Sequence, residues 1–411
     1  MNALSQCTVS RVKEHTQSQT PHHICMHVLG SARTDVRVMR EATALAQAGY
    51  AVSIIDLETA RDRPVEERIA GVVLKHVMTP RAFSSIRFKP LLLLQAAQSL
   101  LRSALRLIQL SADVYHAHDT TALPACALAA FVRRKPLIFD AHELPLSEEV
   151  YGGRWRGLIT LFSWLLALLV PRCAGVITVS SPIAEEIRRR YSRSHVSLIR
   201  NIPLYEQVPR SQRLRQHLEL CQDARIALYQ GAFQANRGLD RLIRAAAFLE
   251  QNNVIVLMGP DTQDFRSQFE SLIVSEGVAD RVKILPAVPY EELLDWTASA
   301  DIGLIVYRPE HSQNVQMCLP NKLFEYLMAG LPILASRLDA VSDIIATYDV
   351  GQIVPALTEE AIGTAINAML ADHVALARMR CNALEAARET LCWEKESQQL
   401  LCLYQRVLKF E

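Results

Sequence analysis

Short apolar runs alternate with longer helical stretches along the whole chain, and this alternation constrains the fold more than any other feature. Such a pattern is typical of α/β proteins, in which each helix crosses back over a parallel sheet. The first series of predicted strands spans residues 24–29, 51–57, 72–77, 114–117, 136–140, 175–180 and 196–199, and the second spans residues 225–229, 253–258, 282–285, 302–307, 332–336 and 351–354. The sequence therefore predicts an α/β fold of two Rossmann-like, doubly wound domains that face each other across a cleft.

A linker that contains Pro203 and Pro209 separates the two series. A chain of 411 residues is also too long for one ordinary hydrophobic core. We predict a disordered polar lead-in at residues 1–20, an N-terminal domain at residues 21–204, a C-terminal domain at residues 205–385, and a C-terminal helix at residues 386–411 that returns to the N-terminal domain. Ligands of such folds bind in the crevice at the carboxyl ends of the strands.

The totals exclude several classes of protein. With 44 basic and 43 acidic side chains, the chain has no overall field that would attract nucleic acid. The nine cysteines are scattered singly, without a C-x-x-C pair or a histidine cluster at metal spacing, so we expect reduced thiols and no metal site. The first twenty residues contain no apolar run of the secretory type. We therefore expect a cytoplasmic protein that binds no nucleic acid.

Two helical segments raise the question of membrane contact. The longest apolar run, residues 157–170, is shorter than the roughly 18 to 20 residues that cross a bilayer. Residues 91–110 form a leucine-rich helix whose polar side chains fall on one predicted stripe: Gln95, Gln98, Arg102, Arg106 and Gln109. One interpretation is a basic amphipathic surface, at residues 91–110 and 154–172, that contacts the inner face of the cell membrane. The other is a pair of ordinary interdomain or solvent-facing helices with arginine rims.

The segment LPNKLFEYLMAGLPILAS, residues 319–336, combines a helix start with a phosphate-binding pattern. Pro320 and Asn321 suit the start of a helix and Gly330 suits its end. Free backbone N–H groups at a helix N-terminus, with Lys322 in the first turn, would hold a phosphate.

One acid, Glu325, lies in the same helix between Phe324 and Tyr326. An unpartnered carboxylate among apolar residues is costly. We therefore expect a hydrogen-bonding partner for Glu325, and a sugar hydroxyl is one candidate.

A second motif, LYQGAFQANRG at residues 228–238, runs from a strand through a glycine turn into a helix. Gly231 lets the backbone approach a ligand closely, and the Arg237 guanidinium can bind a pyrophosphate with two hydrogen bonds. Walker A and G-x-G-x-x-G motifs are absent, which disfavours a nicotinamide enzyme.

Polar residues also follow two predicted strands of the first domain. His118 and Asp119 end the run VYHAHD, and His142 and Glu143 end the run FDAHE, which begins with Phe139 and Asp140. Because the carboxyl ends of neighbouring parallel strands meet at one sheet edge, we expect these groups in one site. The turn at Gly30 and Ser31 follows the first strand and reaches the same edge.

Together these motifs resemble the C-terminal domain of the GT-B glycosyltransferases, specifically the large retaining family called group 1 or family 4. The resemblance covers residues 225–355, is weaker over the first domain, and looks like the branch that assembles bacterial surface polysaccharides. It implies a UDP- or GDP-linked sugar donor with no further cofactor, and a glycan or lipid-linked acceptor. It also implies that Glu325 binds the donor ribose, that Arg237 contacts the pyrophosphate, and that the turn at Gly30 approaches acceptor and donor sugar.

Two positions depart from the family pattern. Met317 stands where the family's E-x7-E pair has its first acid, and Ala232 stands where an arginine often follows the first glycine. Lys322 and Arg237 must then carry the charge of the diphosphate. The predicted catalytic residues are His118, Arg237 and Lys322, and no metal ligand is predicted. The predicted donor-binding residues are Gly231, Arg237, Val288, Asn321, Lys322 and Glu325. The predicted residues of the acceptor or sugar side are Gly30, Ser31, Asp119, His142 and Glu143.

The predicted function is transfer of a sugar from a nucleotide-sugar donor to an acceptor hydroxyl in polysaccharide or glycolipid assembly. Retention of the anomeric configuration is implied by the family. Metal independence is expected because positive side chains replace the ion and no D-x-D pair is present. Two alternatives remain open: a nucleotide-sugar 2-epimerase on the same scaffold, and a catalytically inactive scaffold subunit, which Met317 and Ala232 would favour.

Overall fold

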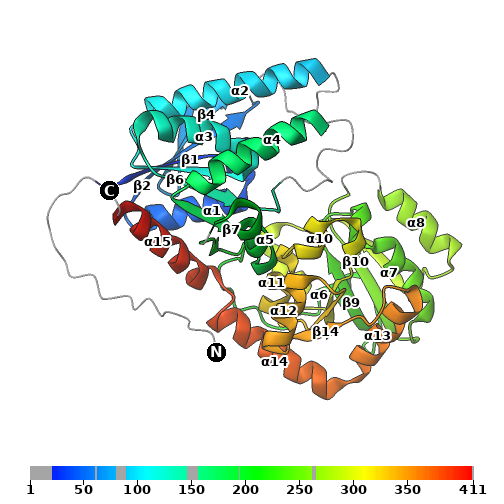
Figure 1. The fold of residues 1–411 in the computed structure, drawn as a ribbon. Coiled ribbons are helices and arrows are strands. Elements are labelled where there is room, and N and C mark those ends of the chain that lie inside the picture. The colour runs from blue at the N-terminus through cyan, green and yellow to red at the C-terminus, as the bar shows by residue number, and fades with distance from the viewer. Residues whose placement is uncertain are drawn as a thin grey trace.

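The computed structural model describes residues 21–60, 63–79, 89–145, 156–193, 195–261 and 265–409. Two lobes, each built on a twisted sheet with helices on both faces, lie at the upper left and the lower right of Figure 1. The predicted lead-in at residues 1–20 and the flanking Arg154 lie outside the described residues. The predicted GT-B arrangement of two Rossmann-like domains is confirmed.

The sheet of the first lobe has the strand order β3-β4-β2-β1-β5-β6-β7-β8. Its strands are β1 (His23–His27), β2 (Ala51–Glu58), β3 (Glu66–Ile69), β4 (Val72–Met78), β5 (Val114–His118), β6 (Leu137–Ala141), β7 (Gly175–Thr178) and β8 (Ser197–Leu198). The helices that cover it from its own half of the chain are α1 (Val36–Gln47), α2 (Lys89–Gln109), α3 (Asp119–Arg133), α4 (Arg156–Leu169) and α5 (Ser181–Tyr191). The strand order reverses between β1 and β5, so the ends of these two strands open a crevice.

The sheet of the second lobe has the order β11-β10-β9-β12-β13-β14 and reverses between β9 and β12. Its strands are β9 (Arg225–Gln230), β10 (Asn253–Met258), β11 (Val282–Leu285), β12 (Ile302–Ile305), β13 (Ile333–Ala335) and β14 (Gly351–Ile353). Its helices are α6 (Arg213–His217), α7 (Leu239–Ala245), α8 (Phe265–Ser275), α9 (Leu293–Thr297), α10 (Gln313–Met317), α11 (Asn321–Met328), α12 (Asp339–Tyr348), α13 (Glu359–Ala371) and α14 (His373–Glu389).

The strand β3 was not predicted. It pairs antiparallel with β4 through a tight turn in which Ala70 and Gly71 both have positive φ angles. Every other strand pair of the two described sheets is parallel. The sequence of β3, EERI, is short and charged, as an exposed edge strand requires, and therefore lacks an apolar signal.

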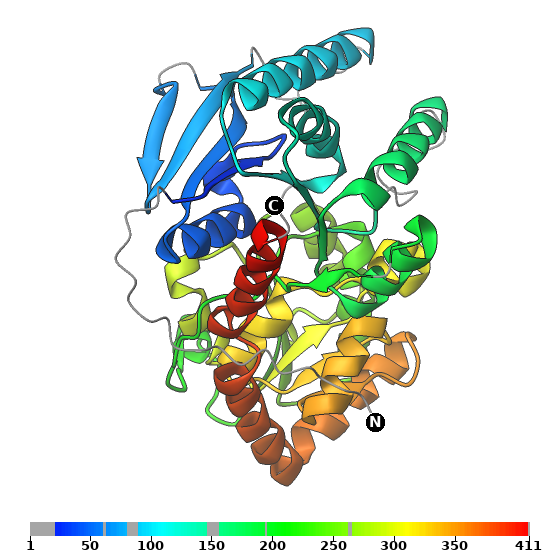
Figure 2. The same ribbon diagram turned by 60° about the vertical axis from the view of Figure 1, so that its left-hand side comes forward.

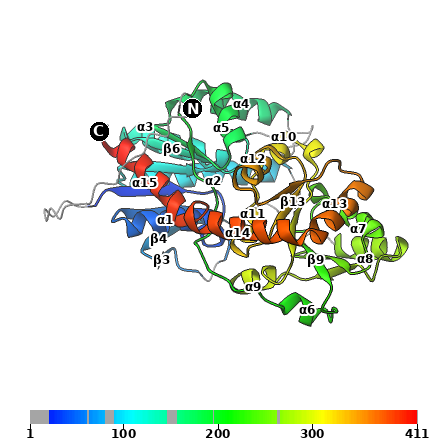
Figure 3. The ribbon, with the colours of Figure 1, turned by 90° about the horizontal axis from the view of Figure 1, so that it is seen from below.

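The last helix, α15 (Trp393–Lys409), joins the two lobes. Figures 2 and 3 show it beside α1, after α14 has packed on the second lobe. Leu400 and Tyr404 of α15 are fully buried in the core of the first lobe, together with Met26 of β1 and Ile138 of β6. The first lobe is thus completed by the last helix of the chain, which begins at Trp393, whereas its first strand begins at His23.

The helix α2 exposes four of the five residues of its predicted polar stripe, Gln98, Arg102, Arg106 and Gln109, and departs from the prediction at the fifth. Gln95, placed on the polar stripe by its spacing, is buried, whereas Leu94, Leu101 and Leu105 are between 51% and 60% exposed. The segment Leu91–Gln109 is long and apolar enough to cross a membrane by length and composition, a test that core helices of globular proteins also pass. Its outward face therefore carries exposed leucines beside the polar stripe.

Candidate active site

A cavity of about 490 Å³ lies between the lobes, at the carboxyl ends of β6, β9 and β12. The second lobe supplies most of its wall, and His142 and Glu143 of the first lobe close one side. All six predicted donor-binding residues line it: Gly231, Arg237, Val288, Asn321, Lys322 and Glu325. The structure thus brings together residues that are almost one hundred positions apart.

Two cations lie on aromatic rings in this wall. The Nζ atom of Lys322 is 3.5 Å from the centroid of the Tyr229 ring, and the Arg237 guanidinium is 4.3 Å from that of Tyr307. Nε of Arg237 donates to Gln234 at 3.1 Å, which orients the guanidinium. Such contacts stabilise a positive charge without neutralising it, so the site retains its attraction for an anion.

Lys322 is 93% buried, since only 7% of the residue is exposed, and no hydrogen-bond partner for its Nζ is found in the described part of the chain. Burial, with the nearby charge of Arg237, holds the pKa of Lys322 well below its ordinary value. A buried ammonium without an acceptor is unfavourable. An anionic ligand with oxygen acceptors would relieve this cost.

Glu325, one turn along α11, has its partner within the protein. Nε2 of Gln230 donates to its Oε2 at 2.5 Å, and Thr297 in turn donates to Oε1 of Gln230 at 2.6 Å. Burial raises the pKa of Glu325, while Gln230 opposes the shift. The carboxylate is therefore held in a fixed orientation at the cavity wall, with its second oxygen outside this bond.

Glycine is required at the turn after β9. Gly231 has a φ of +120°, and a Cβ there would lie 3.1 Å from Nζ of Lys322. A Cβ on the neighbouring Gly259 would lie 2.0 Å from the Gly231 carbonyl oxygen. The two glycines let the ends of β9 and β10 approach the cavity as bare backbone.

On the first lobe, His142 lies between two carboxylates. Its Nε2 is 3.0 Å from Asp140 and its Nδ1 is 3.4 Å from Asp119. Although burial opposes the charged form, these two acids raise the pKa of His142 to about 9. His142 is therefore a cation at neutral pH and faces the cavity. Asp119 begins α3 with a φ of +64°, a strained conformation of the kind found at functional sites.

His118 is placed behind this wall. It is fully buried, its Nδ1 lies 3.2 Å from Asp140, and its ring stacks on His116 at 4.2 Å. It does not line the cavity. In the described structure its contact with the site runs through Asp140 and His142, so the predicted direct role in binding a sugar remains a prediction.

Glu41, His116, His118 and Asp140 are close enough to hold a metal ion together. The guanidinium of Arg37 already lies among them, 2.8 Å from Asp140 and 3.0 Å from Glu41. It supplies positive charge to both carboxylates, and with His142 it holds the pKa of Asp140 well below its ordinary value although burial would raise it. The donor set fits a buried ion-pair network better than a metal site.

Gly30 and Ser31 do not line the cavity. Gly30 is absent from the glycines with positive φ, and nothing lies within 4 Å of the position of its Cβ. The turn therefore does not itself require a glycine, and open space lies above it. An approach of acceptor or sugar to this turn remains a prediction.

Several cavity residues were not predicted. Tyr229 and Gln230 stand inside the LYQG run, but only the glycine of that run carries a recognised signal. Tyr307 and Asn314 lie in loops and short helices whose sequence has no motif. Their roles depend on which strand ends the fold brings together, and this information is absent from the local sequence.

Two family models match the two lobes. The model described as Glycosyltransferase Family 4 matches residues 34–202, and the model described as Glycosyl transferases group 1 matches residues 224–372. The chain belongs to the group 1/family 4 glycosyltransferases. It is therefore a nucleotide-sugar glycosyltransferase of GT-B fold.

Relatives of this glycosyltransferase are distant. The D-inositol 3-phosphate glycosyltransferase 1 of Catenulispora acidiphila is 25% identical over 396 residues, which cover 91% of each chain. Sucrose-phosphate synthase from Thermosynechococcus elongatus superposes with a TM-score of 0.76 at 18% identity, over 95% of this chain and all of that one. The Anabaena protein HepE, solved in complex with UDP-glucose, superposes with a TM-score of 0.71 at 17% identity, over 93% of this chain and 99% of that one. At these identities the solved structures show the fold alone.

Proposed function

We propose that this glycosyltransferase moves a sugar from a UDP- or GDP-linked donor to an acceptor hydroxyl, with retention at the anomeric carbon. The observation that carries the proposal is the buried ammonium of Lys322, which has no hydrogen-bond partner among the described residues and lies at the start of α11 in the cavity wall. The N-terminus of α11 lies in the same cavity wall as Lys322 and Arg237, and the three together offer positive charge and N–H donors to a diphosphate. The Anabaena neighbour with bound UDP-glucose supports a UDP-linked donor.

In this mechanism, the bond between the anomeric carbon and the diphosphate oxygen breaks, and a bond to the acceptor oxygen forms on the same face. The acceptor proton passes to a phosphate oxygen of the departing diphosphate. Lys322 and Arg237 stabilise the negative charge that develops there, in place of a metal ion. Glu325 binds the ribose hydroxyls with the oxygen that Gln230 leaves open.

On the acceptor side, His142 presents a positive charge to the cavity, and His118 orients it through Asp140. A glycan or a lipid-linked sugar would offer its hydroxyl from this side, as in the assembly of surface polysaccharides. A relative named D-inositol 3-phosphate glycosyltransferase supports a small phosphorylated acceptor as the alternative to a glycan.

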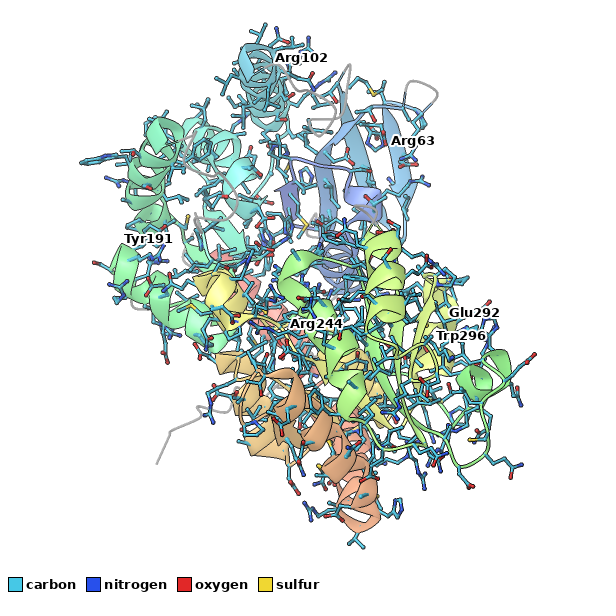
Figure 4. The ribbon with its side chains drawn as sticks, turned by 90° about the vertical axis from the view of Figure 1, so that its right-hand side faces the viewer. Arg63, Arg102, Tyr191, Arg244, Glu292 and Trp296 are labelled. Atoms are coloured by element: carbon cyan, nitrogen blue, oxygen red, sulfur yellow. The ribbon has the colours of Figure 1, made fainter. Side chains whose placement is uncertain are left out.

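We further propose a cytoplasmic enzyme in peripheral contact with an anionic membrane. The outer ends of α2, α3 and α4 expose large apolar side chains, namely Leu101, Leu105, Leu128, Phe131, Leu161, Trp164 and Leu168. Between residues 101 and 109 and between residues 128 and 135 the sequence contains Arg102, Arg106, Arg133, Arg134 and Lys135 but no acid. Figure 4 shows Arg102 at the end of the molecule away from the second lobe, where its guanidinium donates to the carbonyl of Met78 at 3.4 Å. Apolar area with basic charge favours an anionic leaflet.

The donor site is tested with Glu325→Ala and Arg237→Ala, each compared with the wild type. Binding of UDP, GDP and a panel of their sugars is measured by calorimetry, and products are analysed with candidate acceptors. Matched controls are Glu291→Ala and Arg241→Ala, which remove the same charges from the second lobe outside the cavity. We expect both site variants to lose nucleotide affinity and both controls to keep it. Undiminished binding and turnover in both site variants would refute the assignment.

The same panel separates the alternatives. A 2-epimerase would convert the donor sugar without any acceptor, and an inactive scaffold subunit would give no heat with any nucleotide. Met317 and Ala232 are the features that favour the scaffold. The cation pair at Lys322 and Arg237 favours the transferase, because a chain without an anionic ligand would gain nothing from a buried, unpartnered ammonium.

A further inference from the structure

The short helix α10 connects the two lobes beside the cavity. It follows β12 and ends four residues before α11 begins, so it belongs to the chain segment that carries Lys322. Figure 1 shows α10 beside α5 of the first lobe. Its residue Gln313 accepts from Arg190 of α5 at 3.0 Å, and the carbonyl of Met317 accepts from Ser180 at 2.9 Å.

Met317, the residue that replaces the family acid, packs against the core of the first lobe. That core includes Val179 and Ile183 at the end of β7 and the start of α5. A thioether in this position cannot accept hydroxyl hydrogen bonds as a carboxylate does. The position therefore holds the lobes together, and a polar contact with the transferred sugar must come from elsewhere.

Asn314, between these docking residues, has both amide atoms engaged across the lobes. Its Oδ1 accepts from the backbone N–H of Leu144 at 3.2 Å, and its Nδ2 donates to Oε2 of Glu143 at 2.9 Å. The reverse orientation of the amide would set oxygen against carboxylate and N–H against N–H, so only this orientation satisfies both partners. Glu143 is exposed, so its side chain could otherwise adopt several rotamers. The hydrogen bond from Asn314 selects one of them.

The carboxylate of Glu143 shares its cavity with the cations Lys322 and Arg237. Glu143 and Asn314 both line the cavity, as does Cys318. Burial raises the pKa of the Cys318 thiol to about 11, and the charges of Arg237, Glu143 and Lys322 all act on that pKa. Glu143 comes from the first lobe and the two cations from the second, so a carboxylate and two cations from different lobes line one cavity. In a nucleotide sugar the sugar directly follows the diphosphate, so a diphosphate on the cations leaves the sugar in the cavity that Glu143 also lines.

We propose that Asn314 is a positioning residue that orients Glu143 so that its second carboxylate oxygen accepts a hydroxyl of the transferred sugar. The proposal rests on the proposed function, because it needs the diphosphate at Lys322 and Arg237. Glu143 recognises the sugar and not the nucleotide. A change at Asn314 therefore alters the affinity gained by adding the sugar to UDP and leaves the affinity for UDP itself unchanged.

The decisive variants exchange donor and acceptor within the pair. In Asn314→Asp a second carboxylate meets Glu143, the hydrogen bond is lost, and like charges drive Glu143 away. In the double variant Asn314→Asp with Glu143→Gln, the glutamine amide donates to the new carboxylate, which still accepts from Leu144, and the glutamine oxygen faces the sugar. The hydrogen-bond pattern is thereby restored with its direction reversed.

The measurement is calorimetry of the full chain with UDP, UDP-glucose, GDP and GDP-mannose. For the nucleotide that binds, we expect Asn314→Asp to reduce the ratio of sugar-nucleotide to nucleotide affinity about tenfold, within the range for contacting polar pairs, and the double variant to recover it to within about threefold. Gln313→Ala is the matched control, because it also removes a hydrogen bond between α10 and the first lobe but lies outside the cavity. It should leave the ratio unchanged.

Each outcome decides the proposal. An equal loss in Gln313→Ala, or no recovery in the double variant, would show that α10 only docks the lobes and would overturn it. If Asn314→Asp leaves the ratio of sugar-nucleotide to nucleotide affinity unchanged, the proposal is overturned as well. The proposed function would still stand in that case, provided that the nucleotide binds. Absence of binding by both UDP and GDP would refute the proposed function and this proposal with it. Melting temperatures measured alongside identify any variant that fails to fold, and Asn314→Ser then replaces Asn314→Asp.

Discussion

Replacing Lys322 by methionine should separate stability from ligand binding in this enzyme. The side chain is 93% buried, against Tyr229 and Tyr307, and its ammonium has no hydrogen-bond partner in the described structure. Methionine has a similar length and removes the charge. Leaving a buried donor unsatisfied destabilises the folded state by about 1 to 3 kcal/mol, and the cost is larger for a charged donor. The desolvated contact of the ammonium with an aromatic ring offsets about 2 kcal/mol of this cost.

We therefore expect Lys322→Met to stabilise the second lobe by about 1 kcal/mol, which corresponds to a rise in melting temperature of about 2 to 4 °C. The gain depends on pH. Because the pKa of Lys322 is lowered in the folded state, the unfolded chain binds more protons between that lowered pKa and the ordinary value. The penalty of lysine is complete below the lowered pKa and declines as the pH rises, so the advantage of methionine is largest at low pH.

The same variant should lose affinity for UDP. A charge-assisted hydrogen bond contributes about 1.5 to 3 kcal/mol, so its loss reduces affinity about 10- to 100-fold. Scanning calorimetry and titration calorimetry measure the two effects, and Lys283→Met, a lysine of β11 outside the cavity, is the control. A lower melting temperature together with unchanged UDP affinity would refute the reasoning, because Lys322 would then be a structural cation and not an anion receptor.

Three further outcomes are expected. UDP binding should take up protons between the lowered and the ordinary pKa of Lys322, because a bound diphosphate raises that pKa back toward its ordinary value, so UDP affinity falls as the pH rises through this range. Titration in buffers of different ionisation enthalpy measures the uptake, and no uptake at any pH in this range argues against a phosphate at this residue. Tyr404→Phe should destabilise the first lobe by about 1 to 3 kcal/mol, because its hydroxyl and Nδ1 of the buried His116 are 2.7 Å apart; unchanged denaturant unfolding would contradict this. Trp164→Ser with Phe131→Ser should abolish flotation with anionic liposomes while UDP binding persists, since these side chains are 74% and 83% exposed; flotation equal to the wild type would exclude this face.

The two-lobe fold could be predicted because its signals are local. Each predicted strand of the second lobe overlaps an observed strand, since a buried parallel strand is a continuous apolar run that a single segment reveals. The helix at Asn321–Met328 and the placement of Arg237 and Lys322 also follow from local patterns of proline, glycine and charge. The edge strand β3 escaped prediction because exposure removes the apolar signal.

The tertiary structure decided which of these groups meet. Spacing placed Gln95 on the exposed stripe of α2, but the neighbouring helices bury it and leave leucines outside. The sequence placed His118 in the site, whereas the fold puts it behind His142 and Asp140. Asn314 carries no motif, and its contact with Glu143 spans 171 positions. The amino-acid sequence by itself determined the strands, the helix start and its cations, because these depend on neighbours within a few residues. Which charges face each other across the cavity depends on lobe packing, and only the folded chain decides that.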